Sequence, residues 1–239
     1  MSAPGRLYLL PAWLAEDAPP EAVLPAPVLE RLRVLDSFVV EDAKSARRFL
    51  AACGHPRPMR EIEMAELSEH TERNAVPALL GPLLAGRDVG LLSEAGVPAV
   101  ADPGALLVAE AHARGIRVVP LVGPSAILLA LMASGLEGQR FRFLGYLPTE
   151  PAARRSRLLE AERHSARERE TQIFIETPYR NDALLADLLE SCRAATRLAV
   201  AADLTGPNEW IRSDPVEAWK ARPSPAIGKR PAIFLISGS

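Results

Sequence analysis

The sequence Ser93-Glu94-Ala95-Gly96-Val97-Pro98-Ala99-Val100-Ala101-Asp102-Pro103-Gly104 connects a predicted strand to a predicted helix. The apolar run 88–92 before it is typical of a buried strand, and the run 105–111 after it is typical of a helix. This connection is long, because such loops in α/β proteins usually have about two to six residues. Ligands of α/β proteins bind at loops that follow the carboxyl ends of strands, so we expect a binding site here. A rigid crossover without a ligand is the alternative.

Strand-like and helix-like segments alternate along most of the chain, as in an α/β protein. The predicted strands are 6–10, 37–41, 61–67, 88–92, 116–122, 140–148, 171–176, 197–202, 208–212 and 232–236. The predicted helices are 28–35, 45–53, 71–85, 105–111, 123–133, 152–169, 181–191 and 216–221. A break near 135–139 separates two predicted domains, 1–136 and 137–239. The pattern predicts two α/β domains with mostly parallel or mixed sheets.

The composition is that of a folded protein, since 48% of the 239 residues are apolar. A formal net charge of -2 argues against a protein that coats nucleic acid by bulk electrostatics, but it leaves room for a local basic patch. Cys53 and Cys192 lie far apart without a CxxC motif, so we expect neither a disulfide nor a metal site. No apolar run reaches the roughly 18 residues of a membrane span, and the N-terminus lacks a signal peptide's apolar segment. We therefore expect a cytoplasmic protein without a membrane partner.

Glycine-containing or polar segments also follow other predicted strands. Gly123-Pro124-Ser125-Ala126 begins a predicted helix, whose free N–H groups suit a carboxylate, phosphate or hydroxyl. Glu176-Thr177-Pro178-Tyr179-Arg180 and Asp203-Leu204-Thr205 place hydrogen-bonding groups at strand ends. Glu41 also ends a strand and is a candidate to position a substrate or a proton. The alternative interpretation is an ordinary helix cap or turn for the first three segments, and a solvated loop of adjacent acids for Glu41.

The predicted helix 152–169 is rich in arginine, but glutamates are interleaved with the arginines. This pattern favours a solvated, ion-paired helix. Phosphate binding by Arg154, Arg155 and Arg157 is the alternative interpretation.

Several familiar signatures are missing from the chain. It has no GxGxxG after the first predicted strand, no P-loop, no HExxH and no GxSxG. Their absence argues against Rossmann dehydrogenases, nucleoside triphosphatases and serine hydrolases.

Four motifs in their order and spacing resemble the tetrapyrrole methylase superfamily: 93–104, 119–126, 145–148 and 176–180. The branch that they resemble contains the bacterial 16S rRNA cytidine 2′-O-ribose methyltransferase. The resemblance spans nearly the whole chain. It implies a homodimer of two-domain α/β subunits that binds S-adenosylmethionine in a cleft between the domains.

The resemblance also implies which residues bind this cofactor. Those expected from the first domain are Ser93, Ala95, Gly96, Val97, Pro98, Val100, Ser125 and Ala126. Those expected from the second domain are Leu147, Thr177, Pro178, Asp203, Leu204, Thr205, Pro231 and Ala232.

Three segments depart from the pattern of the rRNA enzymes. Those enzymes have a Thr-Pro-Ile-Gly-Asn type loop where this chain has Pro11-Ala12-Trp13-Leu14. They have Glu-Asp-Thr-Arg at Glu41-Asp42-Ala43-Lys44, and Lys-Lys-Phe-Glu-Glu near Gly206-Pro207-Asn208-Glu209. In the family these positions surround the substrate, so the resemblance supports the methyl donor better than the acceptor.

Together these features predict an S-adenosylmethionine-dependent methyltransferase that acts on RNA. A methyltransferase of a small tetrapyrrole-like metabolite and a non-catalytic S-adenosylmethionine-binding module are the alternatives. A hydroxyl acceptor must lose its proton during methyl transfer, and a carboxylate near the methyl group could take it. The candidate bases are Glu94, Asp102 and Glu41, in that order.

Overall fold

The computed structural model describes residues 3–223 and 226–238 of the chain. This part forms two compact units, Met1–Ser125 (unit 1) and Ala126–Ser239 (unit 2), each built on a five-stranded sheet. The predicted α/β fold with parallel and mixed sheets is confirmed.

Unit 1 contains a parallel sheet in the order β3-β2-β4-β1-β5. Its strands are β1 (Arg6–Leu10), β2 (Ser37–Val40), β3 (Glu63–Glu66), β4 (Val89–Leu92) and β5 (Arg117–Pro120). Its helices are α1 (Ala26–Val34), α2 (Ala43–Ala52), α3 (Gly81–Leu84) and α4 (Gly104–Ala113), with 3-10 turns η1 (Pro20–Ala22), η2 (Met59–Glu61) and η3 (Val76–Leu80). Because the strands are parallel, their carboxyl ends share one edge of the sheet, which we call the carboxyl edge of unit 1.

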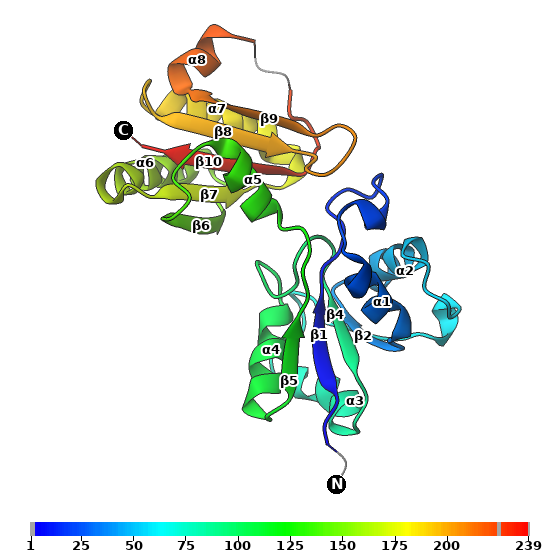
Figure 1. Ribbon diagram of the computed structural model, residues 1–239. Helices are drawn as coiled ribbons and strands as arrows, with labels where there is room; N and C mark the ends of the chain where they lie inside the picture. The colour runs from blue at the N-terminus through cyan, green and yellow to red at the C-terminus, as the bar shows by residue number, and fades with distance from the viewer. Residues whose placement is uncertain (1–2, 224–225, 239) are drawn as a thin grey trace. The chain divides into compact units, whose positions relative to one another are not determined.

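Side chains of this sheet alternate between its two faces, and each face has its own core. Tyr8 and Phe38 pack with α1 and α2 on one face. Leu7 and Val39 pack with η3, α3 and α4 on the other face. Figure 1 shows α4 on one side of the strands and α1 and α2 on the other. Helices on both faces bury the sheet, so its free edge of loops is where a ligand has access.

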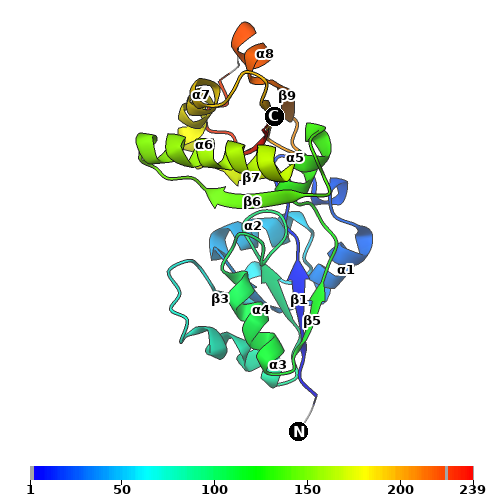
Figure 2. The ribbon, with the colours of Figure 1, turned by 90° about the vertical axis from the view of Figure 1, so that its left-hand side faces the viewer.

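Unit 2 contains a mixed sheet in the order β6-β7-β10-β8-β9, in which β6 and β7 are parallel and the other pairs are antiparallel. Its strands are β6 (Phe141–Tyr146), β7 (Thr171–Ile175), β8 (Arg197–Ala202), β9 (Trp210–Pro215) and β10 (Ala232–Ser237). Its helices are α5 (Ala126–Ser134), α6 (Pro151–Glu168), α7 (Asn181–Ser191) and α8 (Val216–Ala221), with the 3-10 turn η4 (Pro178–Arg180). Helix α6 packs against α7 and runs along β6 and β7 (Figure 2).

Helix α5 lies in unit 2, whereas the expected domain boundary after residue 136 assigned it to the first domain. Its sequence is almost entirely apolar, and it contacts β8, β9 and β10. The Ser213 hydroxyl also donates a hydrogen bond to the carbonyl oxygen of Ser134, at 2.6 Å. The junction of the compact units is therefore at Ser125–Ala126. An apolar helix beside a boundary gives no sequence signal for the side on which it packs.

The predicted helix 71–85 is wrong over its first part. Residues 71–75 form turns, and helical structure is limited to η3 and α3. Pro77 and Pro82 lack the N–H that an interior helical residue donates, so a continuous helix through both is unfavourable. The shorter turns still bury Leu80 and Leu83 in the core beside α4.

Candidate functional site

The loop 93–104 lies at the carboxyl edge of unit 1 and is held by the loop that follows β1. The N–H of Ala12 donates to the carbonyl of Gly96 at 2.8 Å, and the N–H of Gly96 donates to the carbonyl of Trp13 at 3.3 Å. Gly96 has a φ of 72°, and a Cβ there would lie 3.1 Å from Leu14 Cδ2. Glycine therefore allows the two loops to lie close together.

Asp102 fixes the second half of this loop. Its two carboxylate oxygens accept the N–H of Ala99 at 2.9 Å, and Oδ1 also accepts the N–H of Gly104 at 2.7 Å. Ala99 and Ala101 have φ values of 66° and 61°, in the left-handed region that costs a residue with a Cβ about 1–2 kcal/mol. The Asp102 hydrogen bonds compensate for part of this strain, and burial raises the pKa of the carboxyl.

Glu41 and Glu94 follow the neighbouring strands β2 and β4 and lie close together. The N–H of Glu94 donates to Glu41 Oε2 at 3.2 Å. Burial raises the pKa of Glu41, and the charge of Asp102 raises it further. Burial also raises the pKa of Glu94, with the charge of Glu41 as the next cause. The structure thus brings the three candidate bases to one edge, with pKa values shifted toward neutrality.

The other candidates from the first domain lie along the same edge or beside it. Ser93 Oγ donates to the carbonyl of Ala95 at 3.3 Å. Val97 is half-buried and Pro98 is buried, whereas Val100 is half exposed. Ser125 ends unit 1, and Ala126 is the first residue of α5 in unit 2.

The candidates from the second domain share one edge of the unit 2 sheet, which we call the carboxyl edge of unit 2. The strand registers pair Tyr146 with Ile175 and Ala202 with Ala232. The carboxyl ends of β6, β7 and β8 therefore lie beside the start of β10. The N–H of Asp203 donates to the carbonyl of Pro231 at 3.0 Å. This arrangement brings together Leu147, Thr177, Pro178, Asp203, Leu204, Thr205, Pro231 and Ala232.

Buried polar atoms without a protein partner gather at this second edge. Among the described side chains, these atoms are Glu176 Oε2, Asn181 Oδ1 and Thr205 Oγ1. Glu176 directly follows β7, Asn181 begins α7 and Thr205 follows β8. A buried polar atom usually has a hydrogen-bond partner, so three unpartnered atoms at one edge fit a ligand with polar groups. A nucleoside with an amino acid attached, as in S-adenosylmethionine, offers such groups.

Left-handed backbone also concentrates at the two edges. Of the described non-glycine residues with positive φ, Ala99 and Ala101 lie in loop 93–104, and Asp203 and Thr205 follow β8. The remaining one, Arg169, ends helix α6. Strained backbone of this kind often marks functional loops.

Two residues that shape the second edge, Glu176 and Asn181, were not among the predicted cofactor-binding residues, although Glu176 begins the candidate segment 176–180. Glu176 is fully buried, and its Oε1 accepts the N–H of Thr177 at 2.6 Å and Nε of Arg180 at 2.9 Å. The i, i+4 spacing of Glu176 and Arg180 could have indicated this pair. Asn181 Nδ2 donates to the carbonyls of Gly228 and Arg230, at 3.1 and 2.7 Å. No local pattern predicts contacts between residues so far apart in the chain.

Two further properties concern the described residues alone. They contain no group of three or more His, Cys, Asp or Glu side chains arranged to hold a metal ion. None of their helices is both long enough and apolar enough to cross a membrane.

The chain is similar to known proteins over most of its length. The model of the tetrapyrrole (corrin/porphyrin) methylases matches residues 24–219. A protein of Xylella fastidiosa (strain Temecula1) named ribosomal RNA small subunit methyltransferase I is 38% identical over 207 residues, which are 86% of this chain and 70% of that protein. A protein of Pseudomonas aeruginosa with the same name is 37% identical over 218 residues, which are 90% of this chain and 72% of that protein.

Solved structures share the fold. The methyltransferase CobJ matches with a TM-score of 0.64 and 20% identity, over 98% of this chain and 95% of CobJ. The uroporphyrin-III-C-methyltransferase of Thermus thermophilus matches with a TM-score of 0.56 and 22% identity, over 98% of this chain and 94% of that enzyme. The family match and the relatives agree with the motifs at the two carboxyl edges, and the chain is thus a methyltransferase that belongs to the tetrapyrrole (corrin/porphyrin) methylase family.

Proposed function

We propose that this methyltransferase transfers a methyl group from S-adenosylmethionine to a ribose 2′-hydroxyl of 16S ribosomal RNA. The observation that carries the proposal is the name shared by relatives 38% and 37% identical, ribosomal RNA small subunit methyltransferase I. The acceptor nucleotide, a cytidine, is inferred from the resemblance of the motifs to the branch of the 16S rRNA cytidine 2′-O-ribose methyltransferase.

Each unit supplies candidate residues for the proposed cofactor at its own carboxyl edge. S-adenosylmethionine supplies a methyl group activated on a sulfonium. In unit 1 the loop 93–98, together with Val100 and Ser125, supplies backbone groups, with Ala126 following at the start of α5. In unit 2 the unpartnered atoms of Glu176, Asn181 and Thr205 support polar contacts to the ligand.

Methyl transfer is an in-line displacement, so the main work of the protein is to align the acceptor with the methyl group and exclude water. Alignment of this kind lowers barriers by up to about 7–11 kcal/mol in model reactions. As the new C–O bond forms, the S–CH₃ bond breaks and the hydroxyl proton must go to a base.

We assign this proton to Glu94, with Glu41 as the second candidate. Glu94 is exposed at the edge, and its raised pKa makes its carboxylate a better proton acceptor near neutral pH. Glu41 accepts the N–H of Glu94 and so orients it. Asp102 has both oxygens hydrogen-bonded to backbone N–H groups, and we assign it the role of holding the loop.

The altered loop Pro11–Leu14 gives no specific support to a small planar substrate. Ala12 and Trp13 are buried, and Trp13 packs edge-on against Phe49 with ring centroids 5.3 Å apart. The backbone of this loop also forms hydrogen bonds with Gly96, so the loop holds loop 93–104 in place.

We further propose that the enzyme acts as a homodimer in the cytoplasm. The family resemblance implies the dimer, and the exposed apolar side chains of Val122 and Met132 are consistent with an interface. Sedimentation equilibrium of the purified protein tests the dimer, and a monomer at micromolar concentration would contradict it.

The function is tested by incubating the protein with labelled S-adenosylmethionine and small ribosomal subunits that lack the modification. We expect label in 16S RNA, recovered after nuclease digestion as 2′-O-methylcytidine. Fully modified subunits are the control and should remain unlabelled. Label that appears only in a tetrapyrrole added as a competing acceptor would support the metabolite alternative. Cofactor binding by calorimetry without transfer to either acceptor would support a non-catalytic module.

A further inference from the structure

Positive charge is distributed unevenly between the two units. Unit 1 has 12 Lys and Arg residues against 16 Asp and Glu residues, whereas unit 2 has 16 against 14. Within unit 2, the segment 140–170 alone has eight arginines and five glutamates. This segment contains β6 and α6, so the excess of basic residues in unit 2 comes from these two elements and the residues beside them.

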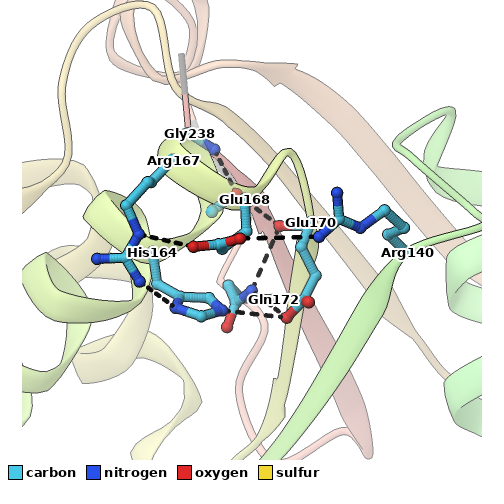
Figure 3. A network of polar contacts seen from close by, with 8 residues as sticks. Arg140, His164, Arg167, Glu168, Glu170, Gln172 and Gly238 are labelled. Atoms are coloured by element: carbon cyan, nitrogen blue, oxygen red, sulfur yellow. Dashed lines mark hydrogen bonds and ion pairs between the residues drawn. The ribbon is translucent and has the colours of Figure 1, made fainter.

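Most charged groups on this surface are already paired. Arg154 and Arg155 both bind the buried carboxylate of Asp187, at 2.6 and 3.1 Å, so they stabilise the packing of α6 on α7. Figure 3 shows a second network, in which Glu168 binds Arg140 and Arg167. These contacts confirm the ion-paired character expected for this helix and argue against phosphate binding by Arg154 and Arg155.

A hollow between β6 and α6 has a different character. Its lining residues are Arg142, Leu144, Arg157, Glu160, Ala161, His164 and Gln172. In the described part of the chain, no hydrogen bond or ion pair holds the guanidinium of Arg142, which is exposed. Arg157 Nη1 binds Glu160 Oε2 at 2.6 Å, but the Glu160 side chain is 68% exposed. Such an exposed ion pair contributes little free energy, so a stronger anion can displace it.

Arg142 and Arg157 both act electrostatically on the Glu160 carboxylate, which lines the hollow. The hydrogen bond and the charge of Arg157 lower the pKa of Glu160, and the charge of Arg142 lowers it further. Two other lining residues of the hollow are fixed by Glu170. Its carboxylate binds His164 at 3.5 Å and the buried Gln172 at 3.0 Å (Figure 3). Arg142 and Arg157 both line this hollow, and guanidinium groups are well suited to bind the oxygens of a phosphate group.

We propose that Arg142 and Arg157 in this hollow bind a backbone phosphate of the RNA substrate. This inference rests on the proposed RNA acceptor and adds an RNA-contacting surface on unit 2 that lies apart from the carboxyl edge of that unit. A phosphate contact holds the RNA in position without reading its sequence, so it affects binding rather than the methyl transfer step.

The test compares wild-type protein with the double variant Arg142→Gln/Arg157→Gln. The matched control is Arg60→Gln, because Arg60 is an 83% exposed arginine of unit 1 with a long ion pair to Glu61. Methyl transfer to unmodified small subunits gives KM and kcat. Fluorescence anisotropy with a naked 16S fragment over a series of KCl concentrations gives Kd and its salt dependence.

For the double variant we expect KM and Kd to rise about tenfold, with kcat and the cofactor Kd unchanged. The slope of log Kd against log salt should fall by about 1, the value for one lost phosphate contact. Values equal to those of Arg60→Gln would overturn the inference while leaving the methyltransferase activity intact. An effect on whole subunits but not on naked RNA would also overturn it, in favour of a ribosomal protein contact.

The failure of the proposed function has a separate signature. It would appear as wild-type protein that transfers no label to RNA. The anisotropy measurement then still decides the inference, since wild-type binding that the double variant loses supports it and absent wild-type binding overturns it.

Discussion

The carboxyl edges of the two units use carboxylates in opposite ways. In unit 1, burial and, to a smaller extent, nearby like charges raise the pKa values of Glu41 and Glu94 at a partly exposed edge. In unit 2, Glu176 is fully buried beside the cation of Arg180. The first arrangement keeps carboxylates in a state that is ready to accept a proton. The second fixes a loop and leaves one oxygen for a ligand. We therefore propose that similar strand-end positions serve chemistry in unit 1 and structure in unit 2.

Removal of the buried carboxylate is expected to have the largest effect. Glu176→Ala leaves Arg180 and the N–H of Thr177 without their partner, which should lower the free energy of unfolding by about 3 kcal/mol or more. Urea unfolding followed by the fluorescence of Trp210 and Trp219, both in unit 2, measures the change. Glu190→Ala, at an exposed position on α7, is the control and should change stability by less than about 0.5 kcal/mol. Equal unfolding midpoints for the two variants would show that the Glu176 contacts contribute nothing.

The next prediction tests whether Glu94, at the carboxyl edge of unit 1, accepts the proton of the acceptor hydroxyl. Glu94→Gln keeps the size of the side chain but cannot accept the proton, so kcat should fall about 100-fold or more while the unfolding midpoint stays near that of wild type. The wild-type kcat should rise with pH through the raised pKa of this carboxyl and then level off, and the variant should lose this rising limb. A pH–rate profile measures both features.

The variant Asp102→Asn tests whether Asp102 only holds the loop in position, while Glu94 at the same edge is the base. Its hydrogen bonds go to the backbone of the loop, so we expect weaker cofactor binding by calorimetry and a rising pH limb that is retained. If Asp102→Asn removes the limb and Glu94→Gln keeps it, the two assignments must be exchanged.

A fourth prediction concerns the close approach of the loops after β1 and β5. A Cβ on Gly123 would lie 2.2 Å from the Cβ of Pro11, in a ring that cannot rotate away. Gly123→Ala should therefore cost about 1–3 kcal/mol of stability and reduce cofactor affinity, because loop 11–14 supports loop 93–104. Gly81→Ala is the matched control, since nothing lies within 4 Å of its added Cβ. Thermal unfolding and calorimetric titration measure the two effects, and equal behaviour of both variants would rule out the clash.

Much of this comparison could be predicted from local sequence. The periodicity gave α7, α8 and β8 at their observed bounds, because each is a strongly patterned segment between clear turn residues. The motifs also marked both edges, since glycine, proline and polar residues gather where strands end. The family model and the relatives confirm the family that the motifs resemble.

Other features depend on contacts between distant residues. The helix expected over 71–85 failed where Pro77 and Pro82 break it, and the unit to which α5 belongs is set by packing against β8, β9 and β10. The proposed division of roles between Glu94 and Asp102 depends on the backbone N–H groups of Ala99 and Gly104, which bind the Asp102 carboxylate. Sequence spacing does not encode such three-dimensional hydrogen bonds.

The smallest predicted effect tests whether burial and nearby like charges disfavour the ionised form of Glu41 at the carboxyl edge of unit 1. Because the pKa of Glu41 is raised above its ordinary value of 4.5, the folded protein binds this proton more tightly than the unfolded chain does. Stability therefore falls as pH rises from that value through the raised folded pKa, and the loss persists at pH 7. Glu41→Gln removes the charge, so it should raise stability at pH 7 by less than about 1 kcal/mol, since the group is partly exposed.

Urea unfolding of wild type and Glu41→Gln between pH 4 and pH 8 measures this effect. The difference between the two proteins should grow with pH through the titration of Glu41 and then stay constant. Glu176→Gln in unit 2 should have the opposite sign, because it removes the charge that pairs with Arg180. If both substitutions destabilise the protein at pH 7, the negative charge stabilises the fold at both edges. This result would contradict the inference that ionised carboxylates are disfavoured at the edge of unit 1, which supports Glu94 as the base.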